Sequence, residues 1–255
     1  MAVKIFDACA QLGAGDRAGD LLESGISADV ILRNMDFANV ERSVVYSVTC
    51  DDYEKSNGEV AEISGKYPEK LCAFARVNPV KPGSAALTEK CFKEYGFKGL
   101  RLRPFHDGFT LKEQGVQDVF KIAGIYKAPV EIDGEKFTGD LEGLIDGFPD
   151  VPVILTHLGD FDNWVWQNTL VYIDWLKNKS NFYLCSCFEI MHFFLEQAIS
   201  EAPGKVIFGS DSPTLPPAME LKRLEMMAMG SPANEKVLGG NLAGLINKSN
   251  GGRKA

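Results

Sequence analysis

The sequence contains few histidines, fewer basic than acidic residues, and no long apolar run. Three histidines occur in 255 residues, and 27 Lys and Arg stand against 35 Asp and Glu, which gives a net charge of -8. Because an acidic surface repels phosphate backbones, we expect no nucleic-acid partner. No apolar run approaches the roughly 18 residues that span a bilayer, and Asp7 interrupts the N-terminal segment before a signal-peptide core could form. We therefore expect a cytoplasmic protein without a membrane partner.

The cysteines lack the spacing of a zinc finger or of a disulfide-stapled domain. None of the six belongs to a Cys-x-x-Cys pair. A chain of this length buries enough apolar surface to fold without disulfides. We expect most of these side chains to be reduced and packed among apolar residues; they are Cys9, Cys50, Cys72, Cys91, Cys185 and Cys187.

Short apolar runs alternate with longer amphipathic stretches along the whole chain, with no linker between them. The amphipathic stretches, such as Ser27–Phe37, Leu111–Tyr126 and Asn163–Lys177, have helical spacing. Eight such units in about 250 residues predict a single (β/α)8 barrel over residues 1–248, with 249–255 as a flexible C-terminal tail. An open doubly wound sheet shares the alternation and is the alternative. The predicted strands are Val3–Cys9, Ser43–Thr49, Leu71–Asn78, Phe97–Arg103, Ala128–Asp133, Val151–His157, Asn181–Cys187 and Lys205–Ser210.

Either architecture directs the search for function to the carboxyl ends of the strands. Alternation along the first strand places Asp7, Cys9 and Gln11 on one face, and along the fourth it places Arg101 and Arg103 on one face. Two guanidinium groups in an acidic protein are a local reversal of charge. They predict a small-molecule substrate that carries a carboxylate, since Arg binds carboxylates through paired hydrogen bonds.

Further polar residues follow the other strands. His106 comes shortly after strand four, Asp133 ends strand five, His157 ends strand six, and Asp211 follows strand eight. Polar side chains are costly inside a barrel unless they have partners or a function. We therefore predict Cys9, Asp133, His157 and Asp211 as catalytic residues, and Arg101, Arg103, Gln11 and His106 as substrate-binding residues.

Six stretches carry a resemblance to a known family, and they run in the family's order across almost the whole chain. They are Ile5–Ala8 (IFDA), Met35–Val45 (MDFANVERSVV), Gly96–Leu102 (GFKGLRL), Val153–Gly159 (VILTHLG), Val206–Pro213 (VIFGSDSP) and Gly239–Leu245 (GGNLAGL). With these motifs the sequence resembles the amidohydrolase-related family, also called amidohydrolase family 2, of the metal-dependent hydrolase superfamily. The resemblance implies a (β/α)8 barrel with a metal site at its mouth.

The sequence departs from the family at that metal site. In the family, the first strand usually ends in His-x-His, two metal ligands, and these positions hold Cys9 and Gln11 here. The ligand His that usually ends the fifth strand falls by position on Asp133, whereas the sixth-strand His and the eighth-strand Asp are kept as His157 and Asp211. Three of four imidazoles are therefore missing, and the sequence predicts a degenerate metal site.

Three hypotheses follow from this departure. The first is a hydrolase with a single divalent ion such as Zn²⁺, held by Cys9, Asp133, His157 and Asp211. The second is a metal-free enzyme, a lactonase or decarboxylase, in which Asp211 or His157 moves a proton while the arginines hold a carboxylate. The third is a ligand-binding descendant that has lost its chemistry. A homodimer also stays open, because the aromatic stretch Phe161–Trp166 suits a subunit contact as well as a pocket cover.

Overall fold

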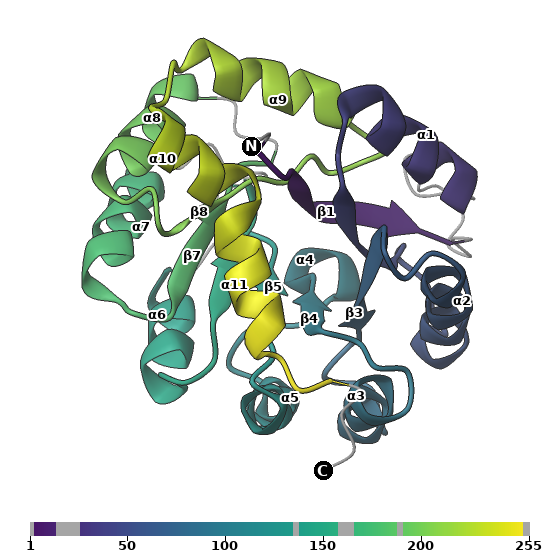
Figure 1. The fold of residues 1–255 in the computed structure, drawn as a ribbon. Coiled ribbons are helices and arrows are strands. Elements are labelled where there is room, and N and C mark those ends of the chain that lie inside the picture. Colours follow the sequence, from purple (N-terminus) through teal and green to yellow (C-terminus); the bar gives the residue numbers. More distant parts are fainter. Residues whose placement is uncertain (1–2, 14–25, 135–137, 158–165, 188–190, 252–255) are drawn as a thin grey trace.

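Eight parallel strands form a nearly closed barrel with helices around it (Figure 1). A computed structural model describes residues 3–13, 26–134, 138–157, 166–187 and 191–251. Each strand pairs with its neighbour in sequence order. Backbone bonds join the first strand to the segment that follows the last one: the Ala8 amide donates to the Phe208 carbonyl at 3.0 Å, and the Gln11 amide to the Ser212 carbonyl at 2.8 Å. The alternation in the sequence thus predicts the architecture correctly, and the open sheet is excluded.

The elements alternate along the chain as the barrel requires. The strands are β1 (Phe6–Leu12), β2 (Arg42–Ser47), β3 (Leu71–Arg76), β4 (Gly99–Leu102), β5 (Val130–Ile132), β6 (Val153–Leu155), β7 (Phe182–Cys185) and β8 (Val206–Ile207). The helices are α1 (Ala28–Ala38), α2 (Tyr53–Lys66), α3 (Ser84–Lys93), α4 (Pro104–Asp107), α5 (Gln114–Tyr126), α6 (Thr138–Gly147), α7 (Trp166–Asn178), α8 (His192–Glu201), α9 (Pro217–Met226), α10 (Ser231–Glu235), the π-helix η2 (Lys236–Gly240) and α11 (Asn241–Lys248).

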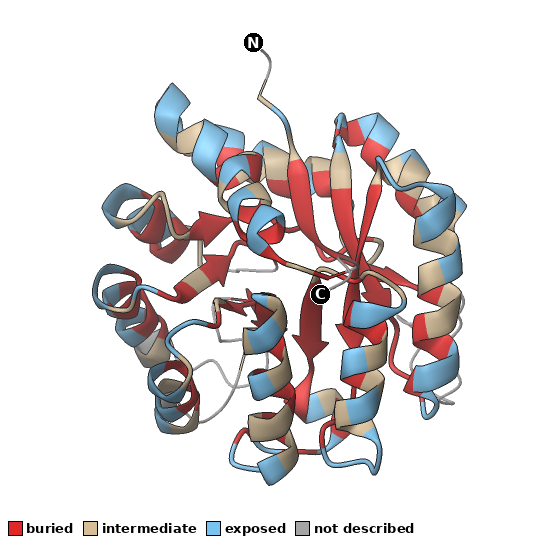
Figure 2. Cartoon of the chain, turned by 60° about the horizontal axis from the view of Figure 1, so that its bottom comes forward, coloured by how far each residue is buried: buried red, intermediate tan, exposed pale blue. Residues whose placement is uncertain are grey.

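Apolar side chains form two clusters, one on each side of the strands. The larger lies between the strands and the outer helices, where α1 contributes Ile31 and Met35. The smaller occupies the barrel interior and includes Tyr46, Phe74 and Ile154. Because both faces of the strands are buried, each strand appears in the sequence as a nearly continuous apolar run. Figure 2 shows this burial as a red barrel inside helices whose outer faces are exposed.

Helix α11 covers one end of the barrel. Its Leu242, Leu245 and Ile246 belong to the interior cluster together with Phe6, the first residue of β1. In Figure 1 this helix, in yellow, lies across the barrel, and it contacts β1 and β8. The amino-terminal end of the barrel is therefore closed by α11, and the carboxyl ends of the strands lie at the other end, which we call the mouth.

The predicted boundaries differ most in β1, which was expected at Val3–Cys9. The pairing with β2 begins only at Phe6, which lies opposite Arg42, so the strand starts later than the apolar run. An irregularity in register between Asp7 and Ala10 then carries β1 on to Leu12. The extra residue breaks the strict alternation from which one shared face for Asp7, Cys9 and Gln11 was predicted.

At the C-terminus the packed part of the chain extends beyond the predicted boundary at 248. Ser249 is buried, the Asn250 amide donates to the Tyr126 carbonyl at 2.8 Å, and Lys98 Nζ donates to the Gly251 carbonyl. The last four residues of the predicted tail, and residues 161–165 of the aromatic stretch Phe161–Trp166, lie outside the described residues. In the described ranges, no helix combines the length and the apolar character needed to cross a membrane.

Candidate active site

Two of the predicted catalytic residues lie at the mouth in a backbone conformation that L-residues rarely adopt. His157 has φ 58° and Asp211 has φ 62°, both in the left-handed region. Such a conformation costs a non-glycine residue roughly 1–3 kcal/mol and recurs at functional sites. His157 lies two residues after the end of β6, and Asp211 lies four residues after the end of β8. The turn at each strand end therefore places an imidazole and a carboxylate at the edge of the barrel interior.

Two arginines and a carboxylate form the centre of the mouth. Arg101 Nη2 donates to Asp133 Oδ1, and Arg103 Nε donates to Asp133 Oδ2 at 2.5 Å. Arg101 Nη1 also lies 3.3 Å from Glu131 Oε2, and its guanidinium stacks over the Tyr46 ring at 4.8 Å from the centroid. We call Arg101, Arg103, Asp133 and Glu131 the guanidinium centre. The structure confirms that both arginines share one face of the strand-four segment.

Burial and charge act in opposite directions on the two carboxylates of this centre. Burial alone would raise the pKa of Asp133, but the guanidinium groups of Arg101 and Arg103 outweigh it and hold that pKa well below 3.8. Glu131 lies deeper and has only one arginine beside it, so burial raises its pKa to about 8. At neutral pH two guanidinium charges therefore face one carboxylate charge, and the centre is positive inside an acidic protein.

The buried pair of Arg101 and Glu131 has unsatisfied hydrogen-bonding groups. Among the described residues, Nε and Nη1 of Arg101 and both Oε atoms of Glu131 have no hydrogen-bond partner. Both side chains are almost fully buried. Buried polar atoms without a partner cost about 1–3 kcal/mol each. A contribution to the stability of the fold therefore does not by itself explain the buried pair of Arg101 and Glu131.

Substrate-binding candidates surround Arg103 where it reaches the mouth. Its Nη2 lies 2.7 Å from His106 Nε2, and its Nη1 donates to Gln11 Oε1 at 3.4 Å. A bond at 3.4 Å is near the outer limit of a hydrogen bond and is therefore weak. The structure brings together the four residues predicted to bind substrate, with Arg103 between Gln11 and His106.

His157 lies beside the same carboxylate. Its Nδ1 is 3.9 Å from Asp133 Oδ1, and Thr156 Oγ1 donates to that oxygen at 2.8 Å. Burial lowers the pKa of His157 below 6.5, although Asp133 and Asp211 oppose the shift. The imidazole is therefore mostly neutral at pH 7 and can accept a proton.

Cys9 connects the guanidinium centre to Asp211. Its Sγ lies 2.9 Å from Tyr46 Oη and donates to Asp211 Oδ1 at 3.5 Å. Burial, followed by a hydrogen bond with Cys187, raises the pKa of the Cys9 thiol well above 9. The residue is therefore a thiol rather than a thiolate. Cys185 and Cys187 are fully buried beside it in the interior cluster, as packing residues are.

Asp7 lies below the mouth and ties β1 to the loop that carries Asp211. Its Oδ1 accepts hydrogen bonds from the Ser210 amide at 2.8 Å and the Cys9 amide at 3.0 Å, and its Oδ2 accepts one from Ser210 Oγ at 2.5 Å. Burial raises its pKa to about 7, although these hydrogen bonds oppose the shift. The contacts give Asp7 a positioning role, since Ser210 immediately precedes Asp211.

The donors at the mouth do not fit a divalent ion as they are arranged. Both oxygens of Asp133 accept hydrogen bonds from guanidinium groups, and Cys9 would first have to lose a proton that burial holds in place. In the part of the chain that the structure describes, no group of three or more His, Cys, Asp or Glu side chains is arranged to hold a metal.

Three members of the site were not predicted from the sequence: Tyr46, Glu131 and Thr156. For Glu131 a signal existed, because it lies two residues before Asp133 and so on the same face of β5. Tyr46 and Thr156 lie within or beside apolar strand residues and gave no such signal. Their roles depend on which side chains meet across the barrel.

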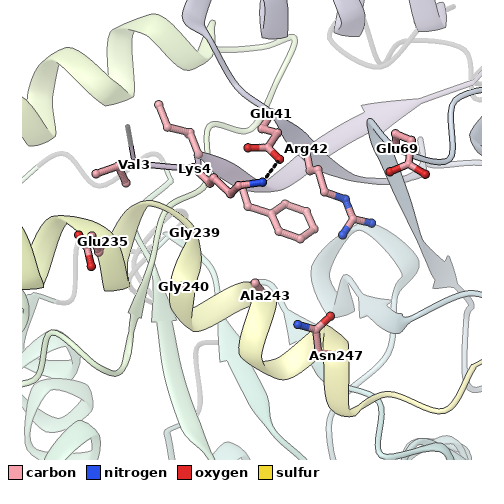
Figure 3. Close-up of a pocket in the computed structure, with 12 residues that line it drawn as sticks. Val3, Lys4, Glu41, Arg42, Glu69, Glu235, Gly239, Gly240, Ala243 and Asn247 are labelled. Atoms are coloured by element: carbon pink, nitrogen blue, oxygen red, sulfur yellow. Dashed lines mark hydrogen bonds and ion pairs between the residues drawn. The ribbon is translucent and has the colours of Figure 1, made fainter. Parts of the chain in front are cut away.

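A cavity of 590 Å³ lies at the end of the barrel opposite the mouth, between β1, β2 and α11 (Figure 3). Arg42 lies there over the Phe6 ring at 4.8 Å from its centroid, and Lys4 pairs with Glu41 at 2.7 Å. This cavity shares no residue with the mouth. In barrels of this kind the amino-terminal end serves stability rather than catalysis.

Comparisons with known proteins agree with the fold and with the family resemblance. A family model described as Amidohydrolase matches residues 21–243. The search of curated proteins gives no significant match. Similar solved structures include 5-carboxyvanillate decarboxylase LigW from Sphingomonas paucimobilis, with a TM-score of 0.75, 15% identity, and coverage of 96% of this chain and 99% of that chain.

Two further structures share the fold at similar distance. The 2,6-dihydroxybenzoate decarboxylase from Rhizobium has a TM-score of 0.73 at 15% identity, covering 96% of this chain and 99% of that one. A dihydroxybenzoic acid decarboxylase from Polaromonas sp. JS666, solved with manganese and the inhibitor 2-nitroresorcinol, has a TM-score of 0.72 at 16% identity, covering 96% and 97%.

Proposed function

Because the chain belongs to the amidohydrolase family, we propose that it is an enzyme that acts on a small carboxylate at the mouth of the barrel, with decarboxylation as its reaction. The observation that carries this proposal is the positively charged guanidinium centre next to two strained residues, His157 and Asp211, that can move a proton. Three of the similar structures are decarboxylases of aromatic carboxylates, which supports the same substrate class.

Arg103 is the residue best placed to bind the substrate. Arg101 is 1% exposed and engaged with Asp133 and Glu131, whereas Arg103 is 7% exposed and holds Gln11 through a weak 3.4 Å bond. A substrate carboxylate can replace Gln11 on Arg103 Nη1 and form a charge-assisted hydrogen bond. Arg101 stays behind it as a fixed positive charge that stabilises the negative charge developing on the substrate.

The chemical step then requires one proton. When the bond between the carboxylate and its carbon breaks, the electron pair stays on that carbon, CO₂ leaves, and a proton must bond to the carbon in its place. Asp211 is the proposed donor, with Cys9 and the Asp7–Ser210 bonds holding it in position. His157 is the second proton-transfer group, since it can restore the proton to Asp211 from solvent.

Hydrolysis of a lactone is the second candidate reaction, and the same groups support it. Water would attack the lactone carbonyl, His157 or Asp211 would accept its proton, and the arginines would stabilise the oxyanion. A binding protein without turnover is the remaining alternative. The reaction products separate the three possibilities.

The test is a panel of aromatic carboxylates and small lactones that begins with 5-carboxyvanillate and 2,6-dihydroxybenzoate. Proton NMR follows CO₂ loss or ring opening, and calorimetry follows binding. We expect Arg103→Met to weaken carboxylate binding about 10- to 100-fold, and Asp211→Asn to abolish turnover while binding persists. The matched control is Arg42→Met, which removes an arginine from the opposite end of the barrel. Binding without turnover across the panel would favour the binding protein, and unchanged binding in Arg103→Met would refute the proposed substrate site.

A further inference from the structure

The guanidinium centre has a second consequence, which concerns metal ions. Asp133 stands where the family resemblance implies a metal ligand, yet its carboxylate is engaged by three donors: Arg101 Nη2, Arg103 Nε and Thr156 Oγ1. A divalent ion on Asp133 would have to displace two guanidinium groups and then lie beside their charges. Guanidinium groups do not lose their protons in proteins, so no change of pH removes this repulsion.

Arg101 lies at the middle of the groups that would otherwise be ligands. It contacts Asp133 and Glu131 directly, it stacks on Tyr46, and it interacts electrostatically with Cys9. Its side chain is 1% exposed, so neither solvent nor a mobile counter-ion shares this position. Its Nε and Nη1 have no hydrogen-bond acceptor among the described residues. Hydrogen bonding therefore does not account for a guanidinium group at this position, whereas its positive charge does.

We propose that Arg101 and Arg103 are the built-in cation of this active site, which supplies the positive charge of a divalent ion and prevents Mn²⁺ or Zn²⁺ from binding at the mouth. A guanidinium can stabilise negative charge on a substrate, but it does not coordinate water and so does not make it a nucleophile. The proton chemistry then depends on Asp211 and His157, which favours decarboxylation over hydrolysis. This inference extends the proposed function and relies on it only for the place where the substrate binds.

The remaining candidate ligands form two pairs, and the described part of the chain brings no three of its His, Cys, Asp or Glu side chains together in a way that could hold a metal. Cys9 Sγ lies 3.5 Å from Asp211 Oδ1, and His157 Nδ1 lies 3.9 Å from Asp133 Oδ1. Ligands about 2.0–2.3 Å from one tetrahedral ion lie roughly 3.5 Å apart, so each pair has nearly the required spacing. Removing both guanidinium groups frees Asp133, which with His157 then offers two ligands without a neighbouring positive charge. The affinity for a divalent cation should therefore rise, and a lysine at position 101 should not raise it, since it keeps the charge.

The experiment measures metal content rather than turnover, so this inference and the proposed function can fail separately. The full chain and its variants are purified without chelator, incubated with MnCl₂ or ZnCl₂, desalted, and examined by elemental analysis and by Mn²⁺ paramagnetic resonance. The variants are Arg101→Lys, the double variant Arg101→Met/Arg103→Met, and Arg42→Met as the matched control. Circular dichroism establishes that each is folded.

We expect no retained ion in the parent, in Arg101→Lys or in Arg42→Met. A titration of free Mn²⁺ followed by paramagnetic resonance should show tighter binding to the double variant than to the parent. A parent chain that retains about one ion would overturn the proposal, and this measurement does not depend on whether any variant folds. A folded double variant that binds Mn²⁺ no more tightly than the parent would also overturn it, because charge would then not be what excludes the metal. Should the double variant not fold, Arg103→Met alone takes its place. It removes one of the two charges, at the more exposed position, so a smaller increase in Mn²⁺ affinity is expected.

Discussion

Replacing Glu131 by Gln tests whether the deepest carboxyl group of the mouth is neutral. Burial raises its pKa from 4.5 to about 8, although Arg101 lies beside it. Glutamine has nearly the same shape and imitates the protonated acid. The substitution therefore removes the ability to ionise while it leaves the packing of the barrel interior almost unchanged.

The pH dependence follows from the direction of this shift. Between pH 4.5 and 8 the folded protein keeps a proton that the unfolded chain has lost, so the parent loses stability as pH rises through this window. A rise from 4.5 to about 8 corresponds to at most about 5 kcal/mol, at 1.36 kcal/mol per pKa unit. Glu131→Gln should be about as stable as the parent at pH 5 and more stable, by up to several kcal/mol, at pH 8.5.

The assay is urea unfolding of both proteins at pH 5, 7 and 8.5, with the slope of each transition compared to establish that both unfold alike. Asp7 also titrates, with its pKa raised to about 7, but it is present in both proteins and cancels in the comparison. A variant that is less stable than the parent at every pH, and most of all at pH 8.5, would refute the reasoning. Glu131 would then be ionised and paired with Arg101.

Three further predictions concern neighbouring residues. Asp133→Asn should destabilise the fold by about 3–5 kcal/mol in urea unfolding at pH 7, because it leaves two buried guanidinium groups without a counter-charge; a loss below about 1 kcal/mol would contradict the ion pairs. The pKa of Asp133 is held well below 3.8, so its stabilising effect is complete above pH 4, and Asp133→Asn should lack the acid-induced loss of stability that the parent shows below that pH. Asp7→Asn should lower turnover without changing carboxylate affinity, because it loosens the loop before Asp211; equal loss of both would contradict a positioning role. Gly99→Ala should destabilise the barrel, since a Cβ atom would lie 2.5 Å from the Phe74 ring; wild-type stability in thermal unfolding would contradict this packing.

The fold could be predicted from the sequence because each strand is buried on both faces. Such strands appear as short apolar runs, and the intervening helices have their own period, so their order along the chain already defines the barrel. The boundaries of β1 could not be predicted. Pairing with β2 and the irregularity after Asp7 determine where it begins and ends, and both are tertiary features.

The members of the site could be predicted better than their partners. Strand-end position was enough to select Arg101, Arg103, Asp133, His157 and Asp211, because parallel strands bring their carboxyl ends to one place. The sequence did not show that Asp133 is engaged by both arginines, since this depends on side-chain reach across β4 and β5. The ionisation of Glu131 and Cys9 likewise depends on burial in the folded barrel.

Carboxylate binding in the presence of a chelator tests the guanidinium centre as substrate site most directly. Calorimetric titration with 2,6-dihydroxybenzoate, in buffer containing EDTA, is carried out on the parent, on Arg103→Met and on Arg42→Met. We expect the parent and Arg42→Met to bind with the same affinity with and without chelator, and Arg103→Met to bind about 10- to 100-fold more weakly. Parent binding that appears only when Mn²⁺ is added, or that is unchanged in Arg103→Met, would contradict the guanidinium centre as the substrate site.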